Sequence, residues 1–322
     1  MTDPATLHLR VHQAQGLAPG PRLIVLGAVH GNETCGTLGI ERVLAEIDSG
    51  ALPIVRGLVT FVPRANPLAF ARGQRSGERN LNRNLRPGAL PQDFEDRIAN
   101  RLCPLLAAHE VLLDLHSIQS PGEPFAMLGP RDNRGALEPF THAADEERLA
   151  RHLGPRRIVE GWLDVYEAGV RRRRERGGGA ALVTDPNYGV GTTEYMRASG
   201  GWGLTLECGQ HADPNAPQVA WRAIRQALAL LGIADIALEP PPAVHDEMLR
   251  LAEVTDRLHP EDRFSREWVS FDPVHAGEVI ARRHDGTPVL APAHGRIVFP
   301  NPRAEPGQEW FYLALPSDRR LR

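Results

Sequence analysis

RLIVLGAVHGNETCGTLGIERVLAEI, residues 22–47, is the stretch that decides the fold of this 322-residue chain. Its apolar beginning, residues 22–29, is typical of a strand that is buried on both faces of a mostly parallel sheet. From Thr34 onward the apolar residues recur at helical spacing, which predicts a helix directly after the strand. The stretch therefore predicts a strand–helix unit with His30 at the strand end and Glu33 near the helix start.

Further apolar runs repeat this pattern along the first 240 residues. They predict strands at residues 57–63, 109–116 and 203–207, and helices at residues 93–108 and 216–231. Strands that alternate with helices indicate an α/β domain, which we place at residues 1–237.

The chain changes character after this domain. LEPPPA, residues 238–243, interrupts the helical spacing and marks a domain boundary. The short apolar stretches that follow are separated by turn residues, which predicts a small β-domain at residues 244–322. Residues 120–190 are rich in Pro, Gly and Arg and are predicted to form loops around short helices.

The composition is that of an ordinary folded protein, with 42% hydrophobic and 24% charged residues. A formal net charge of -3 excludes a global attraction to nucleic acid or to an anionic membrane. Every basic residue is an arginine, so lysine Schiff-base chemistry and a lysine general base are excluded.

The three cysteines, Cys35, Cys103 and Cys208, form no CxxC pair and are odd in number. This argues against a disulfide framework or a thiolate zinc cluster, and we interpret Cys35 and Cys208 as small buried hydrophobic residues. The sequence shows neither an export signal nor an apolar run of membrane-spanning length. We therefore expect a cytoplasmic protein without a membrane partner, and we leave homo-oligomer formation open.

His30, Glu33 and His116 lie at the ends of two predicted strands. The carboxyl ends of neighbouring strands meet at one edge of an α/β sheet, so these residues can converge. A catalytic zinc takes three ligands from histidine and carboxylate and leaves the fourth position to water. The pattern is therefore compatible with a zinc site, but on its own it is weak, because a strand-end histidine in a lone HxxE pair is more often a structural residue.

Five short motifs strengthen this interpretation by their order. They read GAVHGNE (27–33), NPLA (66–69), NLNR (80–83), DLH (114–116) and ECG (207–209). With them the chain resembles the succinylglutamate desuccinylase and aspartoacylase family, relatives of the zinc carboxypeptidases, over about residues 22–236. The resemblance implies a three-layer α/β/α domain with a mixed sheet and a small C-terminal β-domain. It also implies a zinc-dependent amidohydrolase that cleaves the linear amide bond of a small N-acyl amino acid.

The resemblance assigns a role to each matching residue. His30, Glu33 and His116 would bind one zinc ion per chain. Asp114 lies on the same strand face as His116 and either orients it or makes a structural hydrogen bond. Glu207 would be the general base that takes a proton from the zinc-bound water and passes it to the leaving amine.

Alternatives to Glu207 exist among the other acidic residues. Glu207 could instead be an ion-pair partner at the end of a buried strand, and Glu194 and Glu123 are then the candidates for the base. The family's oxyanion-stabilising arginine corresponds to Arg75, with Arg72 and Arg79 as rivals in the same loop.

Asn82 and Arg83 resemble the pair that binds a substrate carboxylate in the family. Arg197 aligns loosely with a second carboxylate-binding arginine of the aspartoacylase branch. Position 80 departs from the pattern, because it is Asn where the family more often has Asp. If that Asp positions an arginine, the orientation of Arg75 or Arg83 differs here, which affects substrate preference.

Arg171–Arg174, together with Arg176, is the most basic run of the chain. We expect a solvated loop there, and a sharper hypothesis is that the run rims the site and steers anionic substrates. It lacks the interleaved aromatic residues that are typical of nucleic-acid binding.

Three other functions compete with the amidohydrolase. A metallocarboxypeptidase would share the zinc site, but the C-terminal β-domain restricts entry to small substrates in the resembled family. An esterase or lactonase with the same site is harder to separate. A non-catalytic zinc-binding or ligand-binding module would lack at least one member of the set. The sequence identifies neither the acyl group nor the amine.

Overall fold

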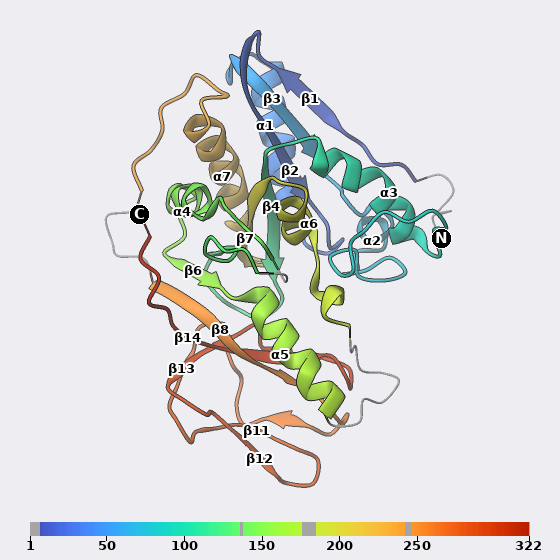
Figure 1. Cartoon of the computed structure of the whole chain (residues 1–322), viewed down its shortest axis with the longest axis vertical. Helices are drawn as coiled ribbons and strands as arrows, with labels where there is room; N and C mark the ends of the chain where they lie inside the picture. The colour runs from blue at the N-terminus through green and yellow to red at the C-terminus, as the bar shows by residue number, and fades with distance from the viewer. Residues whose placement is uncertain (1–6, 136–137, 176–184, 242–246, 322) are drawn as a thin grey trace.

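The computed structural model describes residues 7–135, 138–175, 185–241 and 247–321 (Figure 1). The described strands include an eleven-stranded mixed sheet in the order β1-β3-β2-β4-β7-β5-β6-β8-β14-β13-β10. Its parallel centre consists of β3 (Arg56–Val62), β2 (Ala18–Gly27), β4 (Val111–Ile118) and β7 (Trp202–Gln210). β1 (His12–Gln15) pairs antiparallel with β3 at the edge. The predicted strands of the first domain are therefore present and adjacent.

Helices cover both faces of this parallel centre. α1 (Cys35–Asp48) and α7 (Ala216–Leu230) share one hydrophobic cluster with Leu23 and Val25 of β2. α3 (Phe94–Ala107) and α6 (Thr192–Ala198) share the opposite cluster with Ile24 and Leu26. Successive residues of a strand point to opposite faces, so the continuous apolar run of β2 supplies both cores. The predicted three-layer α/β/α arrangement is confirmed.

The middle of the chain contains more regular structure than predicted. It forms β5 (Phe125–Met127), α4 (Ala143–His152), β6 (Arg157–Glu160), α5 (Trp162–Glu175) and the short 3-10 helix η2 (Pro186–Gly189). The prediction of a solvated loop at Arg171–Arg174 was wrong, because these residues lie in the last turns of α5 and Arg173 is buried. Arg176 lies outside the described residues.

The predicted C-terminal β-region is present and largely antiparallel, but it is joined to the large sheet. β8 (Glu247–Asp256) pairs in parallel with β6, and β14 (Glu309–Pro316), β13 (Gly295–Val298) and β10 (Pro273–Val274) follow it. β9 (Arg263–Phe264), β11 (Val279–Arg282) and β12 (Pro288–Leu290) form a three-stranded sheet at the bottom of Figure 1. The division into domains at 237 and 244 stays a prediction, and residues 242–246 lie outside the described residues.

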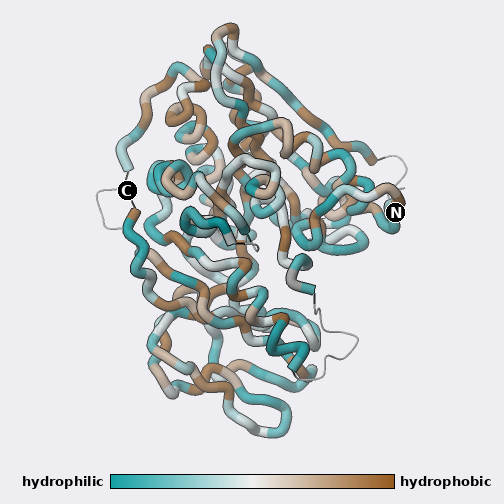
Figure 2. The backbone as a smooth tube through the Cα atoms, viewed as in Figure 1, coloured by the Kyte–Doolittle hydropathy of each residue, from teal (hydrophilic) through white to brown (hydrophobic). Residues whose placement is uncertain are grey.

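Apolar residues are distributed as in a protein with internal cores. Figure 2 shows hydrophilic and hydrophobic segments interleaved along the helices. In the described ranges, no helix has the length and hydrophobicity that a membrane span needs. Cys35 and Cys208 are buried as predicted, and the Cys35 thiol donates to the carbonyl of His116 at 3.2 Å.

Candidate active site

The turn between β2 and α1 carries His30 and Glu33. The backbone of Ala28 has a φ of 48°, and the Glu33 N–H donates to the His30 carbonyl at 3.1 Å. A Cβ on Gly31 would lie 1.9 Å from the carbonyl carbon of Ala69 in α2 (Pro67–Arg72). This turn therefore requires glycine at position 31, since any side chain there would displace α2.

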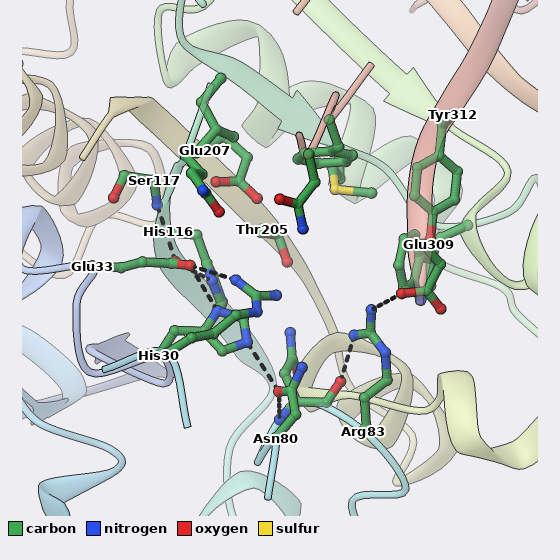
Figure 3. A pocket seen from close by; sticks show the side chains of 18 of the residues that line it. His30, Glu33, Asn80, Arg83, His116, Ser117, Thr205, Glu207, Glu309 and Tyr312 are labelled. Atoms are coloured by element: carbon green, nitrogen blue, oxygen red, sulfur yellow. Dashed lines mark hydrogen bonds and ion pairs between the residues drawn. The ribbon is translucent and has the colours of Figure 1, made fainter. Parts of the chain in front are cut away.

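His116 comes from β4, the neighbour of β2 in the sheet. Its side chain meets those of His30 and Glu33, and one ligand atom from each of the three lies within 4.8 Å of the others. All three residues are at most 2% exposed. The structure thus brings the three predicted metal ligands together at the carboxyl ends of neighbouring strands (Figure 3).

The hydrogen bonds of the two histidines fit a metal site. Asn80 Oδ1 accepts from His30 Nε2 at 3.0 Å, and Asp114 Oδ2 accepts from His116 Nε2 at 2.9 Å. In this tautomer His30 Nδ1 carries a lone pair, yet it lies 2.9 Å from Glu33 Oε1 without a hydrogen bond. Two acceptors so close together repel each other unless a cation lies beside them. The group therefore fits a divalent metal ion.

Electrostatics around these ligands favour the same assignment. Burial, with help from the Arg75 guanidinium, lowers the pKa of His30 to about 4, so that histidine is neutral. Burial alone would raise the pKa of Glu33, but His30 and His116 hold it well below its ordinary value. Burial alone would lower the pKa of His116, but the carboxylates of Asp114 and Glu33 outweigh burial and raise that pKa well above its ordinary value. A metal ion bound there would displace the proton of His116.

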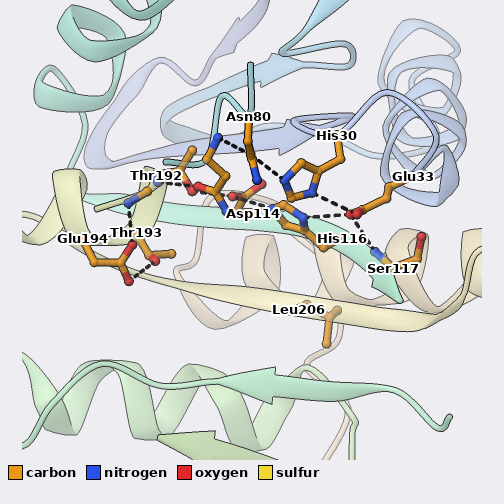
Figure 4. Close-up of polar contacts among 12 residues, drawn as sticks. His30, Glu33, Asn80, Asp114, His116, Ser117, Thr192, Thr193, Glu194 and Leu206 are labelled. Carbon is orange, nitrogen blue, oxygen red and sulfur yellow. Dashed lines mark hydrogen bonds and ion pairs between the residues drawn. The ribbon is translucent and has the colours of Figure 1, made fainter. Parts of the chain in front are cut away.

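Asn80, Asn82 and Thr192 connect the two histidines behind the metal ligands. The Asn82 N–H donates to Asn80 Oδ1, and the Thr192 N–H donates to Asn82 Oδ1, each at 2.9 Å. The Thr192 hydroxyl then donates to Asp114 Oδ2, which completes a path from His30 to His116 (Figure 4). Asn82 Oδ1 is thus occupied by backbone, while Asn82 lines the cavity and its substrate-binding role stays a prediction.

Asn80 occupies a place that the sequence did not indicate. Its side chain contacts His30 and the backbone of Asn82. The arginine that bonds to Asn80 is Arg79, whose guanidinium donates to the backbone carbonyl of Asn80 at 3.2 Å. The side chain at position 80 is therefore bonded to a predicted metal ligand, and an effect of this position on the orientation of Arg75 or Arg83 stays a prediction.

Glu207 lies on β7 directly opposite His116 in the register of the sheet. Its carboxylate lines the same cavity, and its Oε2 atom is buried without a hydrogen-bond partner. Burial raises the pKa of Glu207 to about 8. A carboxylate with these properties is suited to accept and release a proton near neutral pH.

The two alternative bases are held by other partners. Glu194 accepts from the Gly191 N–H at the start of α6 and from the Thr193 hydroxyl. Glu123 forms an ion pair with Arg157 at 2.5 Å and does not line the cavity. Glu207 is therefore the best-placed of the three predicted bases.

One of the three rival loop arginines faces the predicted metal ligands. Arg75 Nη1 donates to Glu33 Oε1 at 2.8 Å, and its side chain is half exposed. Arg72 instead donates to the Gly77 carbonyl, and Arg79 is bound by Asp93 and Asp96. We infer the oxyanion role for Arg75 from this placement.

The two predicted carboxylate-binding arginines differ in their surroundings. Arg83 is buried, lies 4.9 Å over the ring of Trp162, and has its nearest carboxylate, Glu309, at 3.9 Å. Arg197 donates to Glu146, Glu138 and the Gly203 carbonyl through three nitrogens. Arg197 reaches the cavity wall with its guanidinium occupied, so its substrate-binding role stays a prediction.

The cavity has a volume of about 580 Å³ and extends from the metal ligands to Arg83 and beyond. It includes residues that the sequence analysis missed, namely Ser117, Trp162, Tyr188, His211, Glu309 and Tyr312. Ser117 directly follows the DLH motif, and its hydroxyl lies 2.9 Å from His211 Nδ1. His211 lies two residues after the ECG motif, and the other four belong to no recognisable motif, because they reach the cavity from segments distant in sequence.

Comparisons with known proteins agree with this architecture. The sequence model of the Succinylglutamate desuccinylase/Aspartoacylase catalytic domain matches residues 19–124. A succinylglutamate desuccinylase of Pseudomonas paraeruginosa is 26% identical over 320 residues, which cover 92% of this chain and 85% of that protein. One from Burkholderia mallei is 25% identical over 315 residues, or 97% of this chain and 84% of that protein.

Solved structures share the fold. A succinylglutamate desuccinylase/aspartoacylase from Rhodobacter sphaeroides superposes with a TM-score of 0.72 at 17% identity, over 97% of this chain and 90% of that chain. The succinylglutamate desuccinylase from Vibrio cholerae gives 0.70 at 22% identity, over 95% and 85%. The chain therefore has a zinc-carboxypeptidase-like fold. Within that class, the matches confirm the predicted resemblance to the succinylglutamate desuccinylase and aspartoacylase family.

Proposed function

We propose that this chain is a zinc-dependent amidohydrolase that removes the acyl group from a small N-acyl amino acid. The observation that carries the proposal is the buried group of His30, Glu33 and His116 with Glu207 beside it. The desuccinylase names of the relatives support an amide substrate of this kind.

His30, Glu33 and His116 would hold one zinc ion per chain, with both histidines ligating through Nδ1. A bound zinc of this type polarises a carbonyl and lowers the pKa of water towards about 7. Asn80 and Asp114 fix the orientation of the two rings through Nε2.

The reaction on the protein side needs one base and two cations. Glu207 takes a proton from the attacking water, whose oxygen forms a bond to the acyl carbon. The Arg75 guanidinium stabilises the oxyanion that develops. Glu207 then gives its proton to the amine nitrogen as the C–N bond breaks. Arg83 pairs with the substrate carboxylate, while Asn82 holds the loop in place.

Rival functions make different predictions at this site. A metallocarboxypeptidase needs an open path for a peptide, whereas Glu309 and Tyr312 of the C-terminal region wall the far end of the cavity. An esterase or lactonase would use the same groups on an ester. A non-catalytic module would not need a buried base such as Glu207. We favour the amide substrate, and we propose a cytoplasmic location as before.

A deacylation screen tests the proposal directly. N-acetyl, N-succinyl and N-formyl amino acids are assayed beside peptides and esters, with zinc content measured on the same preparation. We expect hydrolysis of at least one N-acyl amino acid at one zinc per chain. A zinc-loaded protein that cleaves only peptides or esters would contradict the proposal.

A further inference from the structure

The far end of the cavity holds a carboxylate, Glu309, at the start of β14 (Figure 3). Its Oε2 lies 3.9 Å from Arg83 Nη2, and its Oε1 lies 3.7 Å from Arg173 Nη2. Both distances exceed hydrogen-bond length. Within the described residues, the Glu309 carboxylate accepts no hydrogen bond, so it faces the cavity with unused acceptor capacity.

Arg173 does not need Glu309 as its counter-charge. Asp256 binds it with two hydrogen bonds, at 3.0 Å to Nε and 2.5 Å to Nη2. Arg83 and Arg173 thus face two carboxylates, Asp256 and Glu309. Among the described residues, two arginines are thus matched by two carboxylates at the far end before any substrate enters.

Arg79 and Arg197, two other arginines of the cavity wall, are already paired with carboxylates. Arg79 is bound by Asp93 and Asp96. Arg197 is bound by carboxylates of the middle segment, at 2.8 and 2.9 Å. Apart from Arg75 at the metal ligands, Arg83 is the described cavity arginine best able to accept a substrate carboxylate. A substrate with several carboxylates would add negative charge that nothing in the described wall compensates.

The hydroxyl of Tyr312 is a second group without a partner at this end. Tyr312 is 4% exposed and lines the cavity, and its hydroxyl oxygen makes no hydrogen bond to any described residue. Burial and the nearby Glu309 raise the pKa of Tyr312 well above its ordinary value, so the hydroxyl stays neutral. A neutral phenol oxygen can accept a hydrogen bond from an ammonium group. Buried polar atoms without partners call for a ligand or water.

We infer that Glu309, with Tyr312, binds a cationic group of the substrate. A substrate carboxylate on Arg83 would lie near Glu309 and be repelled by it, unless the same substrate carries a positive charge that Glu309 can pair with. The substrate class is then an N-acyl derivative of a basic amino acid, with one carboxylate and an uncharged acyl group. The identity of the reaction rests on the proposed function, but the cation site itself does not.

Titration calorimetry with the amine products tests the cation site separately from the proposed reaction. L-lysine is compared with L-norleucine, which has the same chain length without the charge, and with L-glutamate. The protein is tested as wild type, as Glu309→Gln, and as Glu305→Gln, a control four positions earlier outside the cavity lining. KM values for the Nα-acetyl derivatives of the same three amino acids are measured in parallel, and circular dichroism checks folding.

We expect the wild type and Glu305→Gln to bind lysine at least about tenfold more tightly than norleucine, and glutamate more weakly than either. In Glu309→Gln the ratio of the affinities for lysine and norleucine should fall to about one. The KM values of the two Nα-acetyl derivatives should likewise become about equal. A wild type without lysine preference overturns the inference, as does a preference that survives in Glu309→Gln. Equal weakening of lysine and norleucine in Glu309→Gln also overturns it, because Glu309 would then serve only as a counter-ion for Arg83.

The two hypotheses can fail separately. Lysine preference that depends on Glu309, without hydrolysis of any N-acyl amino acid, would leave the cation site standing and remove the proposed reaction. If N-acetylnorleucine and N-acetylglutamate are hydrolysed as efficiently as Nα-acetyllysine, the proposed reaction stands and the cation site is removed.

Discussion

The two ends of the cavity are built differently. At the metal-ligand end, both histidines are fixed by hydrogen bonds of 2.9–3.0 Å that their Nε2 atoms donate to buried or half-buried oxygens of Asn80 and Asp114. At the far end, Glu309 lies 3.7–3.9 Å from its arginine partners, and the Tyr312 hydroxyl has no hydrogen-bond partner among the described residues. The rigid end is suited to chemistry that requires fixed distances, and the looser end is suited to choosing what is bound.

The largest expected effect is at Glu207. Glu207→Gln keeps the shape of the side chain but removes the base, so we expect kcat to fall by about 10²–10⁴-fold. Zinc content should stay at that of the wild type, because Glu207 is not a ligand. Glu123→Gln, outside the cavity lining, is the matched control. Full activity of Glu207→Gln would remove this residue from the mechanism.

Arg75 should give the next largest effect. Arg75→Ala removes the proposed oxyanion donor, and we expect kcat to fall by about 10²–10³-fold. Arg72→Ala, from the same loop but bonded to the Gly77 carbonyl, should leave kcat and KM unchanged. Steady-state kinetics on one N-acyl amino acid compares them, and equal effects of both variants would argue for a general loop defect.

Asp114 and Asn80 test the rigid end without touching a ligand. Asp114→Asn and Asn80→Ala each loosen one histidine, so we expect zinc affinity to fall by about 10–100-fold. Competition with a chromogenic chelator measures the zinc Kd without any assay of activity. If both variants bind zinc as tightly as the wild type, the hydrogen bonds to Nε2 do not preorganise the site.

The smallest effect is expected at the far end. Tyr312→Phe removes a hydroxyl that has no hydrogen-bond partner in the part of the chain that the structure describes, so the Tm should stay the same or rise slightly. Thermal unfolding followed by circular dichroism measures this. A clear loss of stability would show that the hydroxyl has a structural partner and that the far end is as tightly organised as the metal end.

This contrast also explains what the sequence could predict. Short contiguous motifs contain the residues of the metal-ligand end, His30, Glu33, His116 and Glu207. Their convergence could be predicted because the ends of adjacent strands meet, whatever lies between them in the chain. The residues around Asn80 were identified, but the sequence could not show which neighbour its side chain contacts. Which neighbour a loop side chain contacts depends on packing, which spacing alone does not encode.

Elements that depend on long-range packing were missed. The run Arg171–Arg174 has no apolar spacing of its own, yet Tyr166, Val170 and Arg173 follow one helical face, and Asp256 of a distant strand neutralises Arg173. Likewise, Glu309 reaches the cavity because β14 joins the large sheet through β8, a pairing that no local pattern indicates.

The most direct test of the account is zinc dependence measured on one preparation. Zinc is quantified, removed with a chelator and restored, and hydrolysis of an N-acyl amino acid is followed at each stage in the wild type and in His30→Ala. We predict one zinc per wild-type chain, loss of hydrolysis on removal, recovery on restoration, and neither zinc nor hydrolysis in His30→Ala. Undiminished hydrolysis by the zinc-free protein, or stoichiometric zinc retained by folded His30→Ala, would contradict the account.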